Sequence, residues 1–151
     1  MNPADKTTPT QTESIAFEFD LPHPAEKVWR ALTEPALLAE WLLPVAGFKL
    51  DAGASFAFHA QPQPGWDGVV NCKLREIEPH RKLSYAWVVG DIHTVVTFTL
   101  TPAAGSEGKP RTLLSVVQSG FKPSQKQAFG GARYGWRMMG GKLVDLLAKT
   151  E

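Results

Sequence analysis

Cysteine is almost absent from this sequence, since Cys72 is the only one in 151 residues. A single cysteine cannot form a disulfide within the chain, and the N-terminus lacks the basic region and apolar run of a secretory signal. The four histidines stand singly, without the Cys-x-x-Cys or His-x-x-x-His spacing of zinc sites. We therefore expect no metal site, no cofactor and a reducing, cytoplasmic location.

An excess of charge and long apolar runs are missing as well. Sixteen Lys and Arg face 15 Asp and Glu, for a formal net charge of +1, so no broad positive field attracts a phosphate backbone. The apolar residues 35–48 are interrupted by Glu40 and by prolines, and they fall short of the roughly 20 apolar residues of a membrane helix. We expect neither nucleic acid as a partner nor a membrane span.

The motifs of common catalytic sites are also missing. No Gly-x-Ser-x-Gly elbow and no Gly-rich phosphate loop occurs. Cys72 falls in phase with Val70 and Leu74, so we interpret it as a small buried residue rather than a reactive thiolate. With no catalytic residue in view, the sequence favours a protein that is not an enzyme.

The residues that are present suit one globular domain. Hydrophobic residues make up 43% of the chain and charged residues 21%, which is ordinary for a folded protein. Residues 1–13 have almost nothing to bury, and we predict that they form a disordered tail. Residues 14–151 are predicted to form the single domain.

Alternation of apolar and polar residues, typical of strands buried on one face, begins over residues 14–21 and dominates from residue 47 to about residue 118. The predicted inward positions are Ile15, Phe17, Phe19, Leu21, Phe56, Phe58, Val70, Cys72, Leu74, Leu83, Tyr85, Trp87, Val89, Val96, Phe98, Leu100, Leu114, Val116 and Gln118. Short strands this close together predict an antiparallel meander.

Helical spacing occurs in three places. Residues 25–32 and 38–42 carry short apolar stripes, separated by Pro35, and predict two short helices. A longer stripe near the C-terminus consists of Phe129, Ala132, Trp136, Met139, Leu143 and Leu147. The predicted class is therefore α+β, with two short helices and a long C-terminal helix gathered on one side of an antiparallel sheet.

Several of these segments resemble one family. Residues 28–35, VWRALTEP, followed by Trp41, are similar to the opening helices of the START-like (SRPBCC) superfamily. More narrowly, they resemble the branch of the heat-shock-protein ATPase activator C-terminal-domain homologues. Residues 83–87, the strand ending at residues 118–121 and Gly135-Trp136 agree with that branch.

The resemblance covers about residues 14–148 and implies the helix-grip fold, a curved antiparallel sheet with two short helices wrapped around a long C-terminal helix. Members of the superfamily include carriers of apolar ligands, cyclases and co-chaperone domains, which share a cavity between sheet and helix but little chemistry. Where this branch often carries histidine before Ser-Gly-Phe, the sequence has Gln118, so an imidazole acid or base is absent there.

Three functions follow as hypotheses. The first is a non-catalytic domain that binds a small apolar or aromatic ligand between sheet and C-terminal helix. The second is a domain that docks on a chaperone or another protein, and the third is an enzyme of cyclase or hydrolase type. An internal cavity favours the first, and a filled core with an exposed apolar patch favours the second.

The candidate ligand-binding residues share a predicted inward position between sheet and helix; they are Phe58, Tyr85, Trp87, Phe98, Gln118, Trp136 and Met139. Aromatic rings line many ligand pockets, but they also fill ordinary cores, so both interpretations stand. Gln118 is the candidate polar contact, because a buried amide must form hydrogen bonds with the backbone or with a ligand.

Glycines interrupt the predicted C-terminal helix at Gly135, Gly140 and Gly141. Each one costs roughly 1 kcal/mol relative to alanine within a helix. We expect that they allow the helix to bend or to approach the sheet closely. The alternative is that they leave room for a ligand beside Trp136 and Met139.

Overall fold

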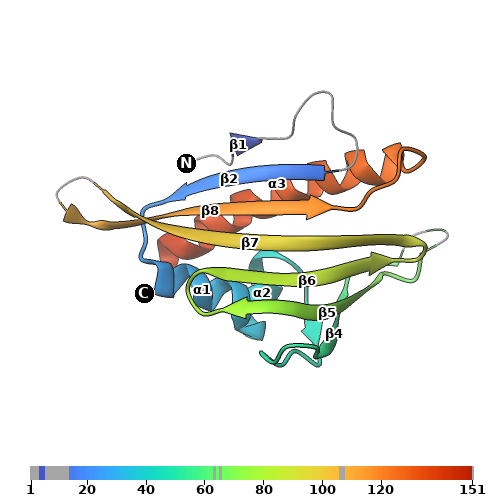
Figure 1. Cartoon of the computed structure of the whole chain (residues 1–151), viewed down its shortest axis with the longest axis horizontal. Helices are drawn as coiled ribbons and strands as arrows, with labels where there is room; N and C mark the ends of the chain where they lie inside the picture. The colour runs from blue at the N-terminus through green and yellow to red at the C-terminus, as the bar shows by residue number, and fades with distance from the viewer. Residues whose placement is uncertain (1–3, 6–13, 63, 65, 106–107, 151) are drawn as a thin grey trace.

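The structure is a computed structural model, and it describes residues 4–5, 14–62, 64, 66–105 and 108–150. The described residues form an eight-stranded antiparallel sheet with the order β1-β2-β8-β7-β6-β5-β4-β3 (Figure 1). The strands are β1 (Ala4–Asp5), β2 (Ser14–Leu21), β3 (Val45–Ala46), β4 (Ser55–His59), β5 (Val69–Glu78), β6 (Lys82–Val89), β7 (Ile92–Ala104) and β8 (Pro110–Ser119).

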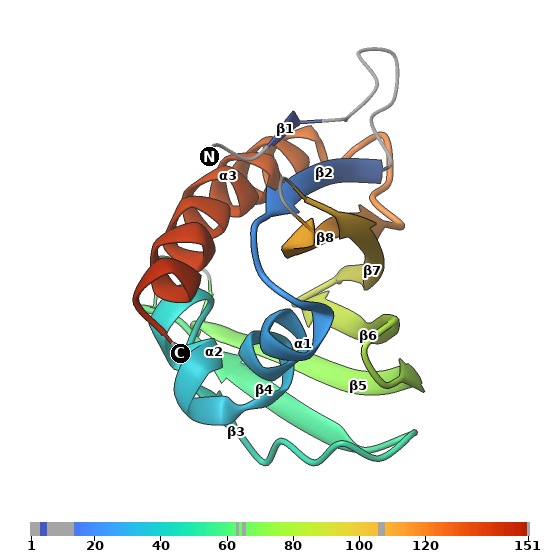
Figure 2. The ribbon, with the colours of Figure 1, turned by 90° about the vertical axis from the view of Figure 1, so that its left-hand side faces the viewer.

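Three helices accompany this sheet in the described residues: α1 (Ala25–Thr33), α2 (Pro35–Trp41) and α3 (Lys126–Lys149). Figure 2 shows the sheet curving around one side, with α3 crossing its concave face and α1 and α2 near the C-terminal end of α3. The helix-grip prediction and its α+β class are confirmed.

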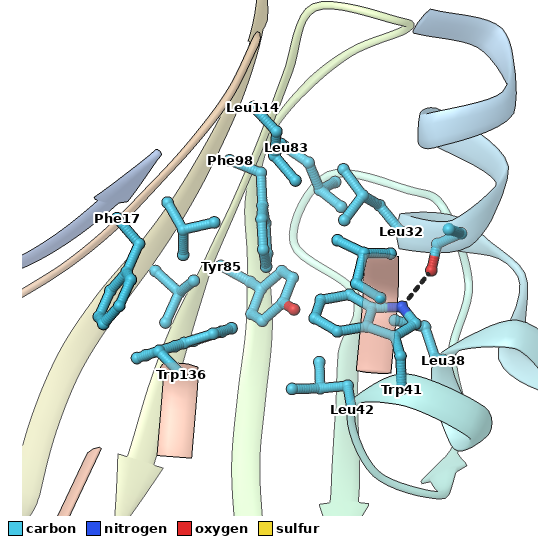
Figure 3. Close-up of a cluster of buried hydrophobic side chains, with 14 of the residues drawn as sticks. Phe17, Leu32, Leu38, Trp41, Leu42, Leu83, Tyr85, Phe98, Leu114 and Trp136 are labelled. Carbon is cyan, nitrogen blue, oxygen red and sulfur yellow. Dashed lines mark hydrogen bonds between the residues drawn. The ribbon is translucent and has the colours of Figure 1, made fainter. Parts of the chain in front are cut away.

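The junction between the two short helices follows from local sequence. Glu34 is extended, as expected before a proline, and Pro35 occupies the first turn of α2, where its missing N–H is not needed. The indole N–H of Trp41 donates to the carbonyl of Ala31 at 2.8 Å (Figure 3). This buried bond holds the two helices in their relative orientation.

The inward positions of the strands form rows across the concave face. One row runs through Ile15, Gln118, Val96, Tyr85 and Leu74, and the next through Thr94, Trp87, Cys72 and Phe56. Most of these side chains are buried, as the alternation predicted. The polar members of the two rows, among them Gln118, Tyr85 and Thr94, are therefore neighbours in an otherwise apolar interior.

The end of β8 requires a glycine. Gly120 has a φ of 109°, in the region that other residues rarely adopt, and a Cβ there would lie 2.9 Å from the carbonyl oxygen of His93. The chain can therefore leave the sheet directly after Gln118 and Ser119, close to β7.

The N-terminal segment contributes one short strand. Ala4–Asp5 forms β1, which pairs with Glu18 and Phe17 of β2 (Figure 1). Two residues of the segment expected to be a disordered tail thus join the edge of the sheet. Residues 1–3 and 6–13 lie outside the described residues, and the prediction for them stays a prediction.

Candidate functional site

An aromatic cluster fills the space where α3 crosses the sheet. The Trp136 ring lies 5.8 Å from the Trp87 ring and 6.0 Å from the Phe98 ring, measured between centroids. Tyr85 and Phe58 extend the cluster, with centroids 5.8 Å from Phe98 and 5.4 Å from Trp87, respectively. The structure thus brings together the five aromatic residues that the sequence singled out.

The members of this cluster differ in exposure. Phe58, Tyr85, Phe98 and Trp136 are almost fully buried, whereas Trp87 is partly exposed. Met139 is also partly exposed and packs against the edge of the core. Trp87 and Met139 therefore lie where the interior meets the surface.

Gln118 is buried, with 3% of its surface exposed, and its amide has partners within the protein. Its Oε1 accepts a hydrogen bond from Trp136 Nε1 at 2.7 Å, and its Nε2 donates to Thr94 Oγ1 at 3.0 Å. Thr94 Oγ1 in turn donates to the carbonyl oxygen of Trp87 at 2.8 Å. This chain of hydrogen bonds links α3 to β8, β7 and β6.

Thr94 is a member of the site that the sequence analysis did not select. It falls in phase with the inward residues Val96 and Phe98, so a polar side chain at an inward position was the signal that could have found it.

The Tyr85 hydroxyl has no hydrogen-bond partner, and among the described residues it is the only buried side-chain oxygen or nitrogen in that state. Burial raises the pKa of Tyr85 well above its ordinary value, so the group stays a neutral hydroxyl. Figure 3 shows its oxygen pointing toward Trp41 and Leu42, on the side of the helices.

The Cys72 thiol lies on the same face but has the properties of a core residue. It is buried and points its Sγ toward the carbonyl oxygen of Val70 at 3.8 Å. Burial raises the pKa of this thiol to about 12, so it is protonated near neutral pH and is a poor nucleophile.

Four glycines of α3 do not mark a close approach to the sheet, whereas the fifth, Gly140, is buried. A Cβ added at Gly130, Gly131 or Gly141 would have no atom within 4 Å, and one at Gly135 would meet only the Met139 methyl group at an ordinary 3.6 Å. The expected close packing is therefore wrong for Gly135 and Gly141. These glycines weaken the helix without being required by its neighbours.

The outer face of α3 carries the largest exposed apolar side chains of that helix. Tyr134 is 63% exposed and Met138 is 51% exposed, one turn apart on the same face. The exposed basic residues of α3 are Lys126, Arg137, Lys142 and Lys149, and its single acid is Asp145.

Other features of the described residues lie away from this interior. A surface hollow of about 600 Å³ lies between the β5–β6 turn and β7, lined by Glu78, Arg81, Lys82, Thr99, Leu100, Thr101 and Pro102, and none of the candidate residues contributes to it. No three His, Cys, Asp or Glu side chains in the described part of the chain gather as a metal site would require. No described helix has the length and apolar character needed to cross a membrane.

Comparison with known proteins gives a family match and several similar structures. Residues 22–148 match the sequence model of the family described as "Activator of Hsp90 ATPase homolog 1-like protein". Protein MLL2253 from Mesorhizobium loti is 40% identical, with a TM-score of 0.81, over 91% of this chain and 98% of that chain. Among curated proteins, none matches the sequence.

Two more distant structures share the fold. CalU16 from Micromonospora echinospora is 24% identical, with a TM-score of 0.71, over 97% of this chain and 84% of that chain. DynU16, from the dynemicin biosynthetic locus, is 23% identical, with a TM-score of 0.72, over 92% of this chain and 48% of that chain.

Proposed function

Because this chain belongs to the Activator of Hsp90 ATPase homolog 1-like family of the START-like superfamily, we propose that it binds a small apolar or aromatic molecule between its sheet and α3, without catalysing a reaction. The observation that carries this proposal is the aromatic lining shared by β4, β6, β7 and α3. Sites for small molecules are mostly apolar and aromatic, with a few placed polar groups, and this interior has that composition.

Access to the interior requires movement, because the rings of Trp136, Trp87 and Phe98 touch. The helix that covers the site is suited to move. Gly130, Gly131, Gly135, Gly140 and Gly141 lie within α3, each costing roughly 1 kcal/mol relative to alanine. Its N-cap residue, Gln125, makes no capping hydrogen bond from its side chain to the helix.

The two halves of α3 are held differently. Its C-terminal half buries Leu143, Leu146 and Leu147. Its N-terminal half is held at Phe129, which packs on Phe121 at 5.4 Å, and at Trp136. We therefore place the opening motion in the N-terminal half, where displacement of Trp136 uncovers Trp87 and Phe98.

Tryptophan fluorescence tests this function. Flat aromatic and lipid-like molecules are titrated into the protein, and we expect a change in emission that disappears when Trp87 and Trp136 are both replaced by phenylalanine. Trp29→Phe is the matched control, because Trp29 lies on α1 against His80, with ring centroids 6.0 Å apart. If no compound changes the emission, or if the change survives in Trp87→Phe/Trp136→Phe, the proposed site is wrong.

A second candidate function is docking on an acidic surface of a protein partner, and the filled interior together with the exposed pair Tyr134 and Met138 favours it. The exposed basic residues of α3 complement such a partner, and the family description names activation of the Hsp90 ATPase. The test is the ATPase rate of purified Hsp90 with the protein added. An increase that Tyr134→Ala/Met138→Ala abolishes supports docking, and an unchanged rate argues against this candidate.

We also propose a cytoplasmic location. Its support is the single cysteine, which is buried and protonated and has no partner cysteine in the chain.

A further inference from the structure

We propose that the Tyr85 hydroxyl is the polar anchor of the interior site and that its ligand is a neutral, apolar molecule with one hydroxyl or carbonyl oxygen. This inference rests on the proposed binding function and names the class of molecule that the site accepts.

The first argument is that Tyr85 differs from every other buried polar side chain of the described core. Ser84 Oγ pairs with Thr97 Oγ1 at 3.1 Å, and Thr112 Oγ1 donates to the carbonyl oxygen of His23 at 2.8 Å. Thr94 and Gln118 bond each other. Since buried polar groups are almost always hydrogen-bonded, one unpaired hydroxyl among paired neighbours marks a position where a partner is missing.

The second argument is the position of the hydroxyl. Tyr85 lies in the middle strands of the sheet, with its ring 5.1 Å from Phe56 and 5.8 Å from Phe98. Its oxygen points away from the sheet, toward Trp41 and Leu42 (Figure 3). A molecule that enters beneath α3 would therefore meet this hydroxyl at the inner end of an aromatic lining.

The third argument concerns charge. The buried polar side chains of the described residues are Ser84, Thr94, Thr112 and Gln118, none of which is charged. No buried cation is present there to balance a carboxylate or phosphate, and burying an unpaired charge is costly. A neutral hydroxyl, which both donates and accepts, suits an alcohol, a phenol or a ketone.

The test compares 2-naphthol, naphthalene and 2-naphthoate, which share one ring system and differ in the polar group. Dissociation constants are measured by tryptophan fluorescence for the wild type, for Tyr85→Phe and for Tyr134→Phe. Tyr134 is the matched control, because it is the other tyrosine in the chain and is exposed on α3. We expect the wild type to prefer 2-naphthol over naphthalene by about tenfold, the factor that one typical hydrogen bond supplies.

Tyr85→Phe should remove this preference, whereas Tyr134→Phe should keep it. Without any probe, Tyr85→Phe should melt at or above the temperature of the wild type, because the variant loses a buried group that has no partner. A hydroxyl with a purely structural role would give the opposite change in melting temperature.

The possible failures are distinguishable. If none of the three probes binds, the proposed function fails and this inference fails with it. If naphthalene and 2-naphthol bind the wild type equally well, or if 2-naphthoate binds best, the binding function stands but the anchor is wrong. A clear drop in the melting temperature of Tyr85→Phe also overturns the anchor, since the hydroxyl would then already be paired in the unliganded protein.

Discussion

Replacing Gln118 with leucine tests the hydrogen bonds that link α3 to the sheet. Leucine has nearly the volume of glutamine, so the main loss is polar. Trp136 Nε1 would become a buried donor without its acceptor, and Thr94 would lose one of its two bonds. An unsatisfied buried donor costs about 1 to 3 kcal/mol, so we expect Gln118→Leu to destabilise the protein by about 2 kcal/mol.

The partner side of this contact gives a double-mutant cycle. Trp136→Phe removes the indole N–H and leaves Gln118 Oε1 without that donor, together with a small loss of buried ring. In Gln118→Leu/Trp136→Phe neither group remains to be unsatisfied. The loss of stability in the double variant should therefore be smaller than the sum of the losses in the two single variants by about 1 to 2 kcal/mol.

The assay is urea unfolding followed by circular dichroism, with the m-value checked for constancy. For a chain of this size, 2 kcal/mol corresponds to a fall in melting temperature of roughly 4 to 8 °C. Additive losses, or a loss below about 0.5 kcal/mol in Gln118→Leu, would refute the hydrogen bond as a stabilising contact. Such a result would leave the Gln118 amide available to a ligand, one of the two partners that the sequence left open.

Three further outcomes are expected. Gly130→Ala/Gly131→Ala/Gly141→Ala should stabilise the protein by about 1 to 3 kcal/mol in urea melts, because the three added methyl groups meet open space. The stiffer helix should also slow ligand association. A destabilised variant would show that glycine is required at these positions. The Cys72 thiol should resist alkylation at pH 9 in the folded protein and react quickly in urea. Because folding raises the pKa of this thiol to about 12 from an ordinary 9.0, the stability of the protein should also fall as the pH rises above about 9. Removing residues 1–13 should lower the melting temperature by no more than 2 °C, roughly the effect of 0.5 kcal/mol, since the described part of this segment is the two-residue β1 at the edge of the sheet.

The inward face of the sheet could be predicted because strand alternation reports directly which side chains share a side. Phe58, Tyr85 and Phe98 lie on that face as expected, and the 3,4 spacing around Trp136 placed the long helix over it. Periodicity also indicated the order of the elements, whereas the curvature of the sheet came from the resemblance of residues 28–35 to START-like proteins.

The hydrogen-bond partners within the site could not be predicted from the sequence. Alternation places Gln118 and Thr94 on one face, but their contact depends on the register between β7 and β8, where Val96 lies opposite Gln118. The missing partner of the Tyr85 hydroxyl is likewise a property of the three-dimensional packing. A glycine in a helix looks the same in sequence whether its surroundings are crowded or open, so the sequence could not show that Gly141 faces open space.

The order of strands in the sheet also has a consequence for how the chain folds. β2 pairs with β8 along its whole length, from Ser14 with Ser119 to Leu21 with Thr112. Two strands that are far apart in the sequence are therefore neighbours in the sheet. Such distant pairings slow folding, because the entropy of closing a large loop is lost before the contact contributes favourable free energy. On the ribosome, the middle strands can pair first, but the sheet cannot be completed until β8 has emerged. Until then, the edges of β2 and β7 that pair with β8 stay unpaired. At this stage the chain is most prone to aggregate, and a chaperone would be most useful.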